Sequence, residues 1–319
     1  MKKAFVLLLC FVLAAGALTG CGGEVKEESG KISVVATIFP EYDWVMNILG
    51  DKAENADVTL LLDGGVDMHS YQPTVDDIVL ISECDLFIYV GGESDAWVTD
   101  ALERAKKDDG EVVSLFRILS DKVVEEELAP GMEAEEEEEE EAYDEHVWLS
   151  VKNAEIICRE LAARLGDIDP ANAKTYSANA EAYIEKLSEL DGKYEDAVKN
   201  GVRDTLLFGD RFPFRYMTDD YGLEYYAAFP GCSAETEASF ETVVLLSGVV
   251  DDLSLPCVLT IETGDGKLAQ TIIDNTKSKS AEILQMDSMQ SVTAKDIAGG
   301  ETYIGIMEHN LSVLEKALA

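Results

Sequence analysis

Short apolar segments recur along the chain at intervals long enough for a helix. Uninterrupted apolar runs with this spacing are typical of parallel strands buried on both faces. The pattern predicts an α/β protein made of two (βα)4 lobes, each with a parallel sheet. The predicted strands cover 32–38, 57–62, 86–90 and 112–115 in the first half and 205–208, 224–229, 257–261 and 282–286 in the second.

A single long amphipathic helix is predicted between the two sets of strands. Apolar residues recur there at spacings of three and four, as on one face of a helix. They are Tyr176, Ala180, Tyr183, Leu187, Leu190, Tyr194 and Ala197. Asp169-Pro170 predicts the start of this helix and Gly201 its end. At about 1.5 Å per residue it would run roughly 45 Å, long enough to connect both lobes.

We therefore interpret 169–201 as a rigid interlobe helix in a monomer, in preference to the seam of a coiled-coil dimer. The expected N-terminal lobe is 31–168 and the expected C-terminal lobe is 202–319.

The first residues resemble a bacterial lipoprotein leader. Two lysines precede an apolar stretch over 4–18, which is too short to cross a hydrocarbon core of about 30 Å comfortably. The predicted signal peptide is 1–20. The Leu-Thr-Gly-Cys sequence that ends at Cys21 resembles a lipobox, which implies lipidation of Cys21 followed by a tether over 21–30. The body is then expected on the extracytoplasmic face of the cell membrane.

Charge is strongly unbalanced, with 25 Lys and Arg against 64 Asp and Glu and a formal net charge of −39. This argues against nucleic acid or anionic headgroups as partners and is compatible with cations. The predicted acidic loop 133–145 supplies ten of the 64 carboxylates, so the rest of the chain is acidic too. Its composition predicts disorder. A solvated spacer and a cation-gathering antenna beside His146 both remain possible roles.

The chain has six cysteines, of which Cys10 and Cys21 belong to the leader. The other four follow no zinc-binding spacing, and an extracytoplasmic location permits three alternative disulfide pairings. We interpret them as buried thiols or disulfides and not as metal ligands. They are Cys84, Cys158, Cys232 and Cys257.

Candidate ligands follow the carboxyl ends of predicted strands, where open parallel sheets bind their ligands. His69 follows the second strand, His146 the fourth, Asp210 the fifth and Asp287 the eighth. Two imidazoles and two carboxylates form a set suited to a divalent cation. We therefore predict a metal site between the lobes. His309 lies on the final amphipathic segment, away from any strand end, and is not expected to bind metal.

Several segments resemble the metal-binding solute-binding lipoproteins of zinc and manganese ABC transporters. They are VVATIFPEYDWVMNILGD, VDMHSYQPTVDDI, CDLFIYVGG, HVWLSVKNA, RYMTDDYGL and TYIGIMEHNLSVLEKAL. They span nearly the whole mature chain in the family's order. The resemblance implies two (βα)4 lobes joined by a rigid helix, a metal ion between them, and an ABC permease as partner. It also implies that His69, His146 and Asp287 are ligands.

The third ligand position departs from the family. Without a gap, the family's His or Glu falls on Arg211, which cannot bind a cation. One inserted residue at Pro213 places Asp210 there instead, and we prefer Asp210 because Gly209-Asp210 is predicted to end its strand. Glu262, at the end of another strand, is the alternative.

Nitrogen and oxygen donors together suit both zinc and manganese. Zinc transporters of the family often carry a histidine-rich insert before the second His ligand, and the glutamate run takes that place here. We therefore favour Zn2+, with Mn2+ or iron as the alternative. No HExxH or GxSxG motif indicates an enzyme. The predicted role is metal capture and delivery to a permease; a surface adhesin with incidental metal binding is the other interpretation.

Overall fold

The structure is a computed structural model that describes residues 31–105, 107, 111–133, 143–233 and 237–319. The predicted signal peptide, Cys21, the tether and residues 134–142 of the acidic loop lie outside the described residues. In the described part, no helix is long and apolar enough to cross a membrane. Residues 32–319 form one compact unit.

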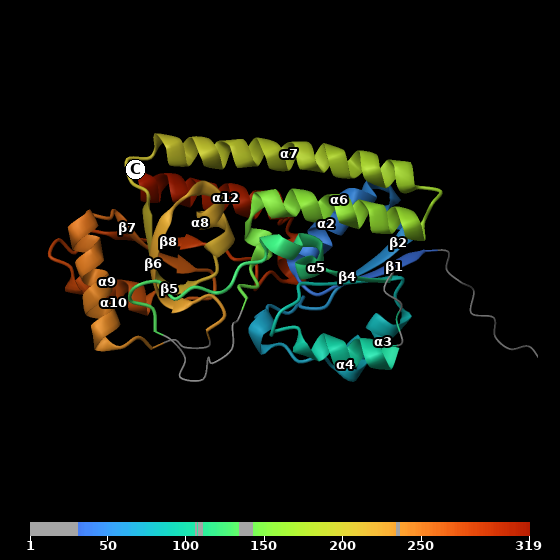
Figure 1. The fold of residues 1–319 in the computed structure, drawn as a ribbon, viewed down its shortest axis with the longest axis horizontal. Helices are drawn as coiled ribbons and strands as arrows, with labels where there is room; N and C mark the ends of the chain where they lie inside the picture. Colours follow the sequence, from blue (N-terminus) through green and yellow to red (C-terminus); the bar gives the residue numbers. More distant parts are fainter. Residues whose placement is uncertain (1–30, 106, 108–110, 134–142, 234–236) are drawn as a thin grey trace, which may run out of the picture. The chain divides into compact units, whose positions relative to one another are not determined.

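Both predicted sheets are present, and all eight predicted strands are confirmed. The first sheet has the order β2-β1-β3-β4 and the second β6-β5-β7-β8, with every pairing parallel. The strands are β1 (Ile32–Ala36), β2 (Ala56–Leu60), β3 (Leu86–Tyr89), β4 (Val112–Ser114), β5 (Thr205–Phe212), β6 (Glu224–Pro230), β7 (Cys257–Ile261) and β8 (Glu282–Met286). The matching orders give the two lobes a common plan (Figure 1).

Helices separate the strands, as expected for parallel connections. Those of the first lobe are α2 (Phe39–Leu49), α3 (Val75–Glu83), α4 (Ala96–Ala105), α5 (Leu115–Leu119) and α6 (Val151–Ile168). Those of the second lobe are α8 (Arg215–Tyr221), α9 (Phe240–Leu253), α10 (Lys267–Asn275), α11 (Ala294–Ala298) and α12 (Tyr303–Leu318). Short 3-10 turns are η1 (Gly50–Asn55), η2 (Met68–Ser70), η4 (Ser120–Lys122) and η5 (Val147–Leu149).

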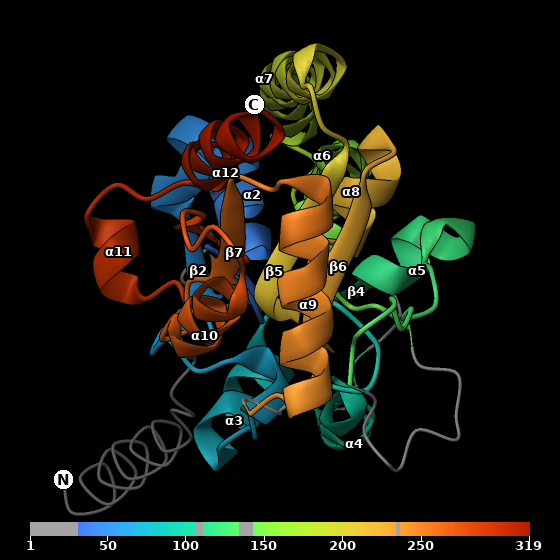
Figure 2. The ribbon, with the colours of Figure 1, turned by 90° about the vertical axis from the view of Figure 1, so that its left-hand side faces the viewer.

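The predicted interlobe helix is α7 (Ala173–Asn200), a single helix of 28 residues. It packs against α2 and α6 of the first lobe and against α8 and α12 of the second (Figures 1 and 2). The predicted start at Asp169 is wrong. Asp169 instead caps the end of α6, and its carboxylate accepts hydrogen bonds from Asn172 Nδ2 at 2.6 Å and the Tyr176 hydroxyl at 2.9 Å. These bonds hold a turn, so the helix begins after Asn172.

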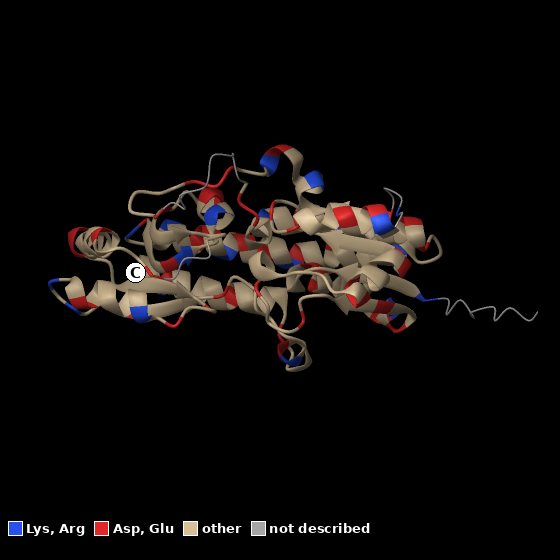
Figure 3. Cartoon of the chain, turned by 90° about the horizontal axis from the view of Figure 1, so that it is seen from below, with Lys and Arg blue, Asp and Glu red and all other residues tan. Residues whose placement is uncertain are grey.

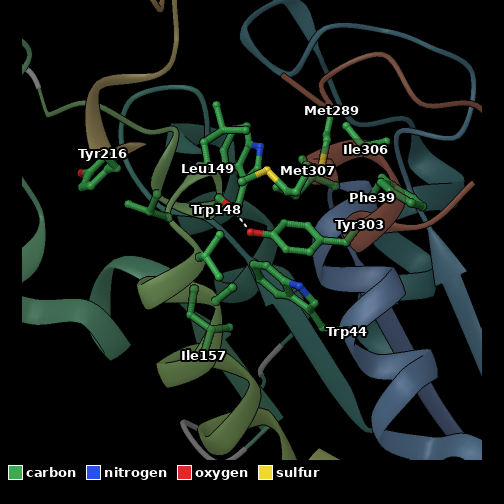
Figure 4. Packing of buried hydrophobic residues seen from close by; sticks show 14 of the residues in the cluster. Phe39, Trp44, Trp148, Leu149, Ile157, Tyr216, Met289, Tyr303, Ile306 and Met307 are labelled. Atoms are coloured by element: carbon green, nitrogen blue, oxygen red, sulfur yellow. Dashed lines mark hydrogen bonds between the residues drawn. The ribbon is translucent and has the colours of Figure 1, made fainter. Parts of the chain in front are cut away.

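One apolar core runs from the first lobe into the second. Trp44 of α2 meets Tyr303 of α12 edge to face, with ring centroids 5.2 Å apart. The Tyr303 hydroxyl donates to the carbonyl of Trp148 in η5 at 2.7 Å (Figure 4). The Trp148 indole donates to the Ser288 carbonyl at 2.9 Å. All three aromatic side chains are fully buried. Because they belong to both halves of the chain, the lobes share a packed interior as well as a covalent connection.

Replacing Tyr303 tests this shared core. Tyr303→Phe should lower the free energy of unfolding by about 1 to 3 kcal/mol, because the buried Trp148 carbonyl loses its donor. Tyr303→Ala should cost about 3 to 5 kcal/mol through the cavity that it leaves. Urea denaturation of the metal-free protein measures both values. A Phe variant as stable as the wild type would show that the hydroxyl does not contribute.

Candidate metal site

Two histidines from the first lobe meet at the carboxyl ends of its strands. His69 lies in η2, which follows β2, and His146 immediately precedes η5. Their Nε2 atoms are 3.3 Å apart. His146 is fully buried, and the side chain of His69 is 11% exposed. The structure brings these two predicted residues together, and their role as metal ligands stays a prediction.

Each imidazole is held through its other nitrogen. His146 Nδ1 donates to Asp144 Oδ1 at 3.0 Å, since a carboxylate only accepts, and Asp144 Oδ1 also accepts from the His146 amide at 2.9 Å. His69 Nδ1 lies 2.7 Å from Ser94 Oγ and 3.5 Å from Glu145 Oε2. Partners of this kind fix ring orientation in metal sites and leave Nε2 for the ion.

The separation of the two Nε2 atoms suits a tetrahedral ion. Two zinc–nitrogen bonds of about 2.0 to 2.1 Å at the tetrahedral angle place the nitrogens about 3.3 to 3.4 Å apart. The observed 3.3 Å falls in this range. The spacing of the two nitrogens is therefore compatible with one cation bound to both rings.

The two histidines have opposite pKa shifts. Burial and the neighbouring His146 lower the pKa of His69 far below its usual value. Burial also acts to lower the pKa of His146, but Asp144 outweighs it, and the pKa of His146 is raised. These shifts favour a neutral His69, which offers its nitrogen lone pair, and they favour His146 as the carrier of any proton on the pair.

A third potential ligand, Cys232, comes from the second lobe. Cys232 lies just after β6, and its Sγ, a nitrogen of His69 and a nitrogen of His146 all lie within 4.8 Å of one another. Burial raises the pKa of the Cys232 thiol well above its usual value, and Glu126 adds to the shift. The thiol is therefore protonated until a cation replaces the proton. The four described cysteines are free thiols, which answers the open question of disulfides for this structure.

The two predicted carboxylate ligands do not join that cluster. Asp210 accepts hydrogen bonds from the amides of Arg211 at 2.9 Å and Ile261 at 3.3 Å. Asp287 accepts from the Met289 amide at 2.7 Å. Among the described residues, the cluster of potential ligands that lie together contains neither carboxylate. Both remain predictions for the metal-bound protein.

The predicted strand end that favoured Asp210 as the third ligand is wrong. β5 does not end at Gly209-Asp210 but continues to Phe212, with an irregular register between Phe208 and Arg211. The alternative donor, Glu262, accepts hydrogen bonds from the Ser288 amide and hydroxyl at 2.8 and 2.7 Å. Its carboxylate therefore organises the loop after β8.

Carboxylates of the second lobe lie close enough to affect one another. Burial raises the pKa of Asp287 to about 7, and Glu262 adds to the shift. Burial also raises the pKa of Asp210. A cation near these groups would favour their ionised forms.

Arg211 connects the lobes beside the histidine pair. Its Nη2 lies 2.7 Å from Oδ2 of Asp67, and Asp67 Oδ1 accepts the His69 amide at 3.1 Å. Arg211 Nη1 donates to the Ser233 carbonyl at 3.4 Å. The residue that aligned with the family's third ligand is thus a fixed cation, paired across the cleft.

Two parallel α/β lobes joined by one helix, with a histidine pair facing a residue of the second lobe, define the class of metal-binding solute-binding proteins. The family described as "Zinc-uptake complex component A periplasmic" matches residues 34–317. The chain belongs to this family.

Curated relatives carry zinc in their names. The chain is 29% identical over 323 residues to "Zinc-binding lipoprotein AdcA" of Streptococcus pneumoniae (strain ATCC BAA-255 / R6), covering 99% of this chain and 61% of that protein. It thus spans about three fifths of the AdcA relatives' length. It is 29% identical over 326 residues to "High-affinity zinc uptake system protein ZnuA" of Bacillus subtilis (strain 168), covering 98% of this chain and 96% of that protein.

Solved structures share the fold. The Zn(II)-bound ZnuA-like domain of S. pneumoniae AdcA aligns with a TM-score of 0.69 at 26% identity, covering 91% of this chain and 99% of that one. The metal-dependent lipoprotein YcdH of B. subtilis aligns with a TM-score of 0.70 at 27% identity, covering 90% and 99%. The predicted two-lobed fold is confirmed.

Removing the charge on Asp144 should lower the pKa of His146. The Asp144 carboxylate raises this pKa in the folded protein, so Asp144→Asn should shift the titration of His146 to lower pH. NMR titration of the metal-free protein measures the shift. An exposed aspartate such as Asp121, changed to Asn, serves as the control and should leave His146 unchanged. An unaltered His146 titration in Asp144→Asn would contradict the assigned role of Asp144.

Proposed function

We infer that this protein captures a zinc ion in the cleft between its lobes and delivers it to an ABC permease. The observation that carries this proposal is the pair of Nε2 atoms 3.3 Å apart, each ring held through Nδ1 by a side chain of the first lobe. Such a pair costs little to organise when the ion binds, because the protein has already oriented it. Family membership and the zinc named in both relatives support the choice of cargo.

His69 and His146 are the proposed anchors of the ion. The remaining positions are proposed to come from the second lobe, where Asp210 and Asp287 are the predicted carboxylates. Each is now bonded to backbone amides, so either would have to exchange those bonds for the metal. Binding from both lobes would make the ion part of the interlobe contact that Arg211 and Asp67 already provide.

Capture without turnover is the proposed mode of action. The charge of −39 raises the local concentration of cations, and acidic positions are spread through both lobes (Figure 3). Cys21 is the proposed lipid attachment that keeps the body near the permease. Because the lobes share one core, the ion is expected to enter through movement of the cleft loops.

Zinc is proposed over manganese. The two anchors are imidazoles, which suit zinc, whereas manganese prefers oxygen ligands. The usual order of divalent affinities also places zinc above manganese at nitrogen-containing sites. The concentration of each metal outside the cell, together with this difference in affinity, determines which ion the protein binds.

Calorimetric titration with zinc, using a competing chelator, tests the proposal on protein lacking the predicted signal peptide. We expect one zinc ion per chain and weaker manganese binding. His69→Ala and His146→Ala should each weaken zinc binding by about a hundredfold or more, because a lost ligand should cost at least as much as a lost outer partner.

His309→Ala is the matched control, since His309 is exposed on α12. It should bind zinc as the wild type does. Unchanged affinity in both His69→Ala and His146→Ala would reject the proposed site.

A further inference from the structure

Cys232 is placed against the histidine pair by the backbone that leads to it. β6 ends at Pro230, and Gly231 passes so close to His146 that a side chain there would not fit. A Cβ added at Gly231 would lie 2.8 Å from His146 Cε1. The Cys232 amide then donates to Glu126 Oε1 at 3.3 Å. Both contacts are to residues of the first lobe, so they hold the Cys232 thiol against the histidine pair.

The distances suit a shared metal ion. A zinc–sulfur bond of about 2.3 Å and a zinc–nitrogen bond of about 2.0 to 2.1 Å at the tetrahedral angle separate sulfur and nitrogen by about 3.5 to 3.6 Å. The thiol and imidazole ligand atoms, which lie within 4.8 Å of one another, need only a small adjustment to reach this geometry.

Buried acceptor oxygens beside His69 support its orientation as a ligand. Glu145 Oε2 and Gln290 Oε1 are buried and have no hydrogen-bond partner in the described part of the chain. Glu145 Oε2 lies 3.5 Å from His69 Nδ1, and the Gln290 side chain is near enough to influence the pKa of His69. An acceptor oxygen at the Nδ1 side of an imidazole orients the ring and supports metal binding through its Nε2.

The two other candidates for the third ligand position already have partners. Arg211 aligns with the family's third ligand, but its guanidinium is paired with Asp67. Asp210 has both carboxylate oxygens on backbone amides. Cys232 belongs to the second lobe, and a backbone hydrogen bond from Glu145 of the first lobe favours the thiolate form of its side chain.

We propose that Cys232 is the third protein ligand of the captured ion, bound as a thiolate beside His69 and His146. This rests on the proposed metal-capture function and names a donor that the family resemblance does not supply. On binding, a metal–sulfur bond forms and the thiol proton passes to solvent. Asp210 keeps its backbone hydrogen bonds, and Asp287 is left as the candidate for the fourth position. A thiolate favours zinc over manganese more strongly than a carboxylate does.

Cobalt(II) substitution tests the proposal directly, because a thiolate bound to cobalt gives a charge-transfer absorption in the near ultraviolet. Reduced wild-type protein should show this band on titration with cobalt. Cys232→Ser should lose the band and bind zinc more weakly by at least about tenfold. Cys84→Ser, which changes a buried thiol at the end of α3, is the matched control and should keep both.

A second measurement uses only the wild-type protein. Zinc should protect Cys232 from alkylation by iodoacetamide, read by mass spectrometry of the Cys232 peptide. Absence of the band together with alkylation of Cys232 at an unchanged rate would overturn the proposal. If zinc still bound through His69 and His146, the capture function would stand without the thiolate. Loss of all tight zinc binding in the wild type would instead reject the capture function itself.

Discussion

The packing of Tyr303 between Trp44 and the Trp148 carbonyl is the interaction on which the rest of this structure depends. It extends one apolar core from α2 of the first lobe to α12 of the second. With the lobes fixed in this way, the loops after β2 and β4 are held facing the loop after β6. The candidate metal site is therefore assembled between lobes that one core holds together, and its ligands can be preorganised.

The fixed arrangement of the lobes explains why each lobe contributes a different kind of group to the candidate site. The first lobe supplies two imidazoles whose orientation is set by Asp144, Ser94 and Glu145, so they need no reorganisation. The second lobe supplies groups whose side chains are still protonated or bonded to amides, as with Cys232 and Asp287. Metal binding would then change mainly the second lobe. Loss of the Cys232 proton and exchange of the Asp287 hydrogen bond would reduce the free energy of binding.

Local patterns were sufficient to predict the sheets and the histidine pair, but they could not predict the rest of the site. Continuous apolar runs mark buried parallel strands, and the strand-end rule selected His69 and His146, which the structure brings together. The same rule misplaced the end of β5, because the strand continues through an irregular register that leaves no mark in the apolar pattern. Cys232 also follows a strand directly, so the rule could have indicated it. Its closeness to His146 depends on Gly231 crossing the cleft, which is a tertiary contact.

Because a shared core holds the proposed ligands in place, the proposed capture needs no large hinge motion. Crystal structures of the metal-free and zinc-loaded protein measure this most directly. We expect the two lobes to superpose together in both states, with Tyr303 and Trp148 still hydrogen-bonded and with displacements confined to the loops around the histidine pair. A hinge rotation that separates Tyr303 from Trp148 in the metal-free protein would contradict it.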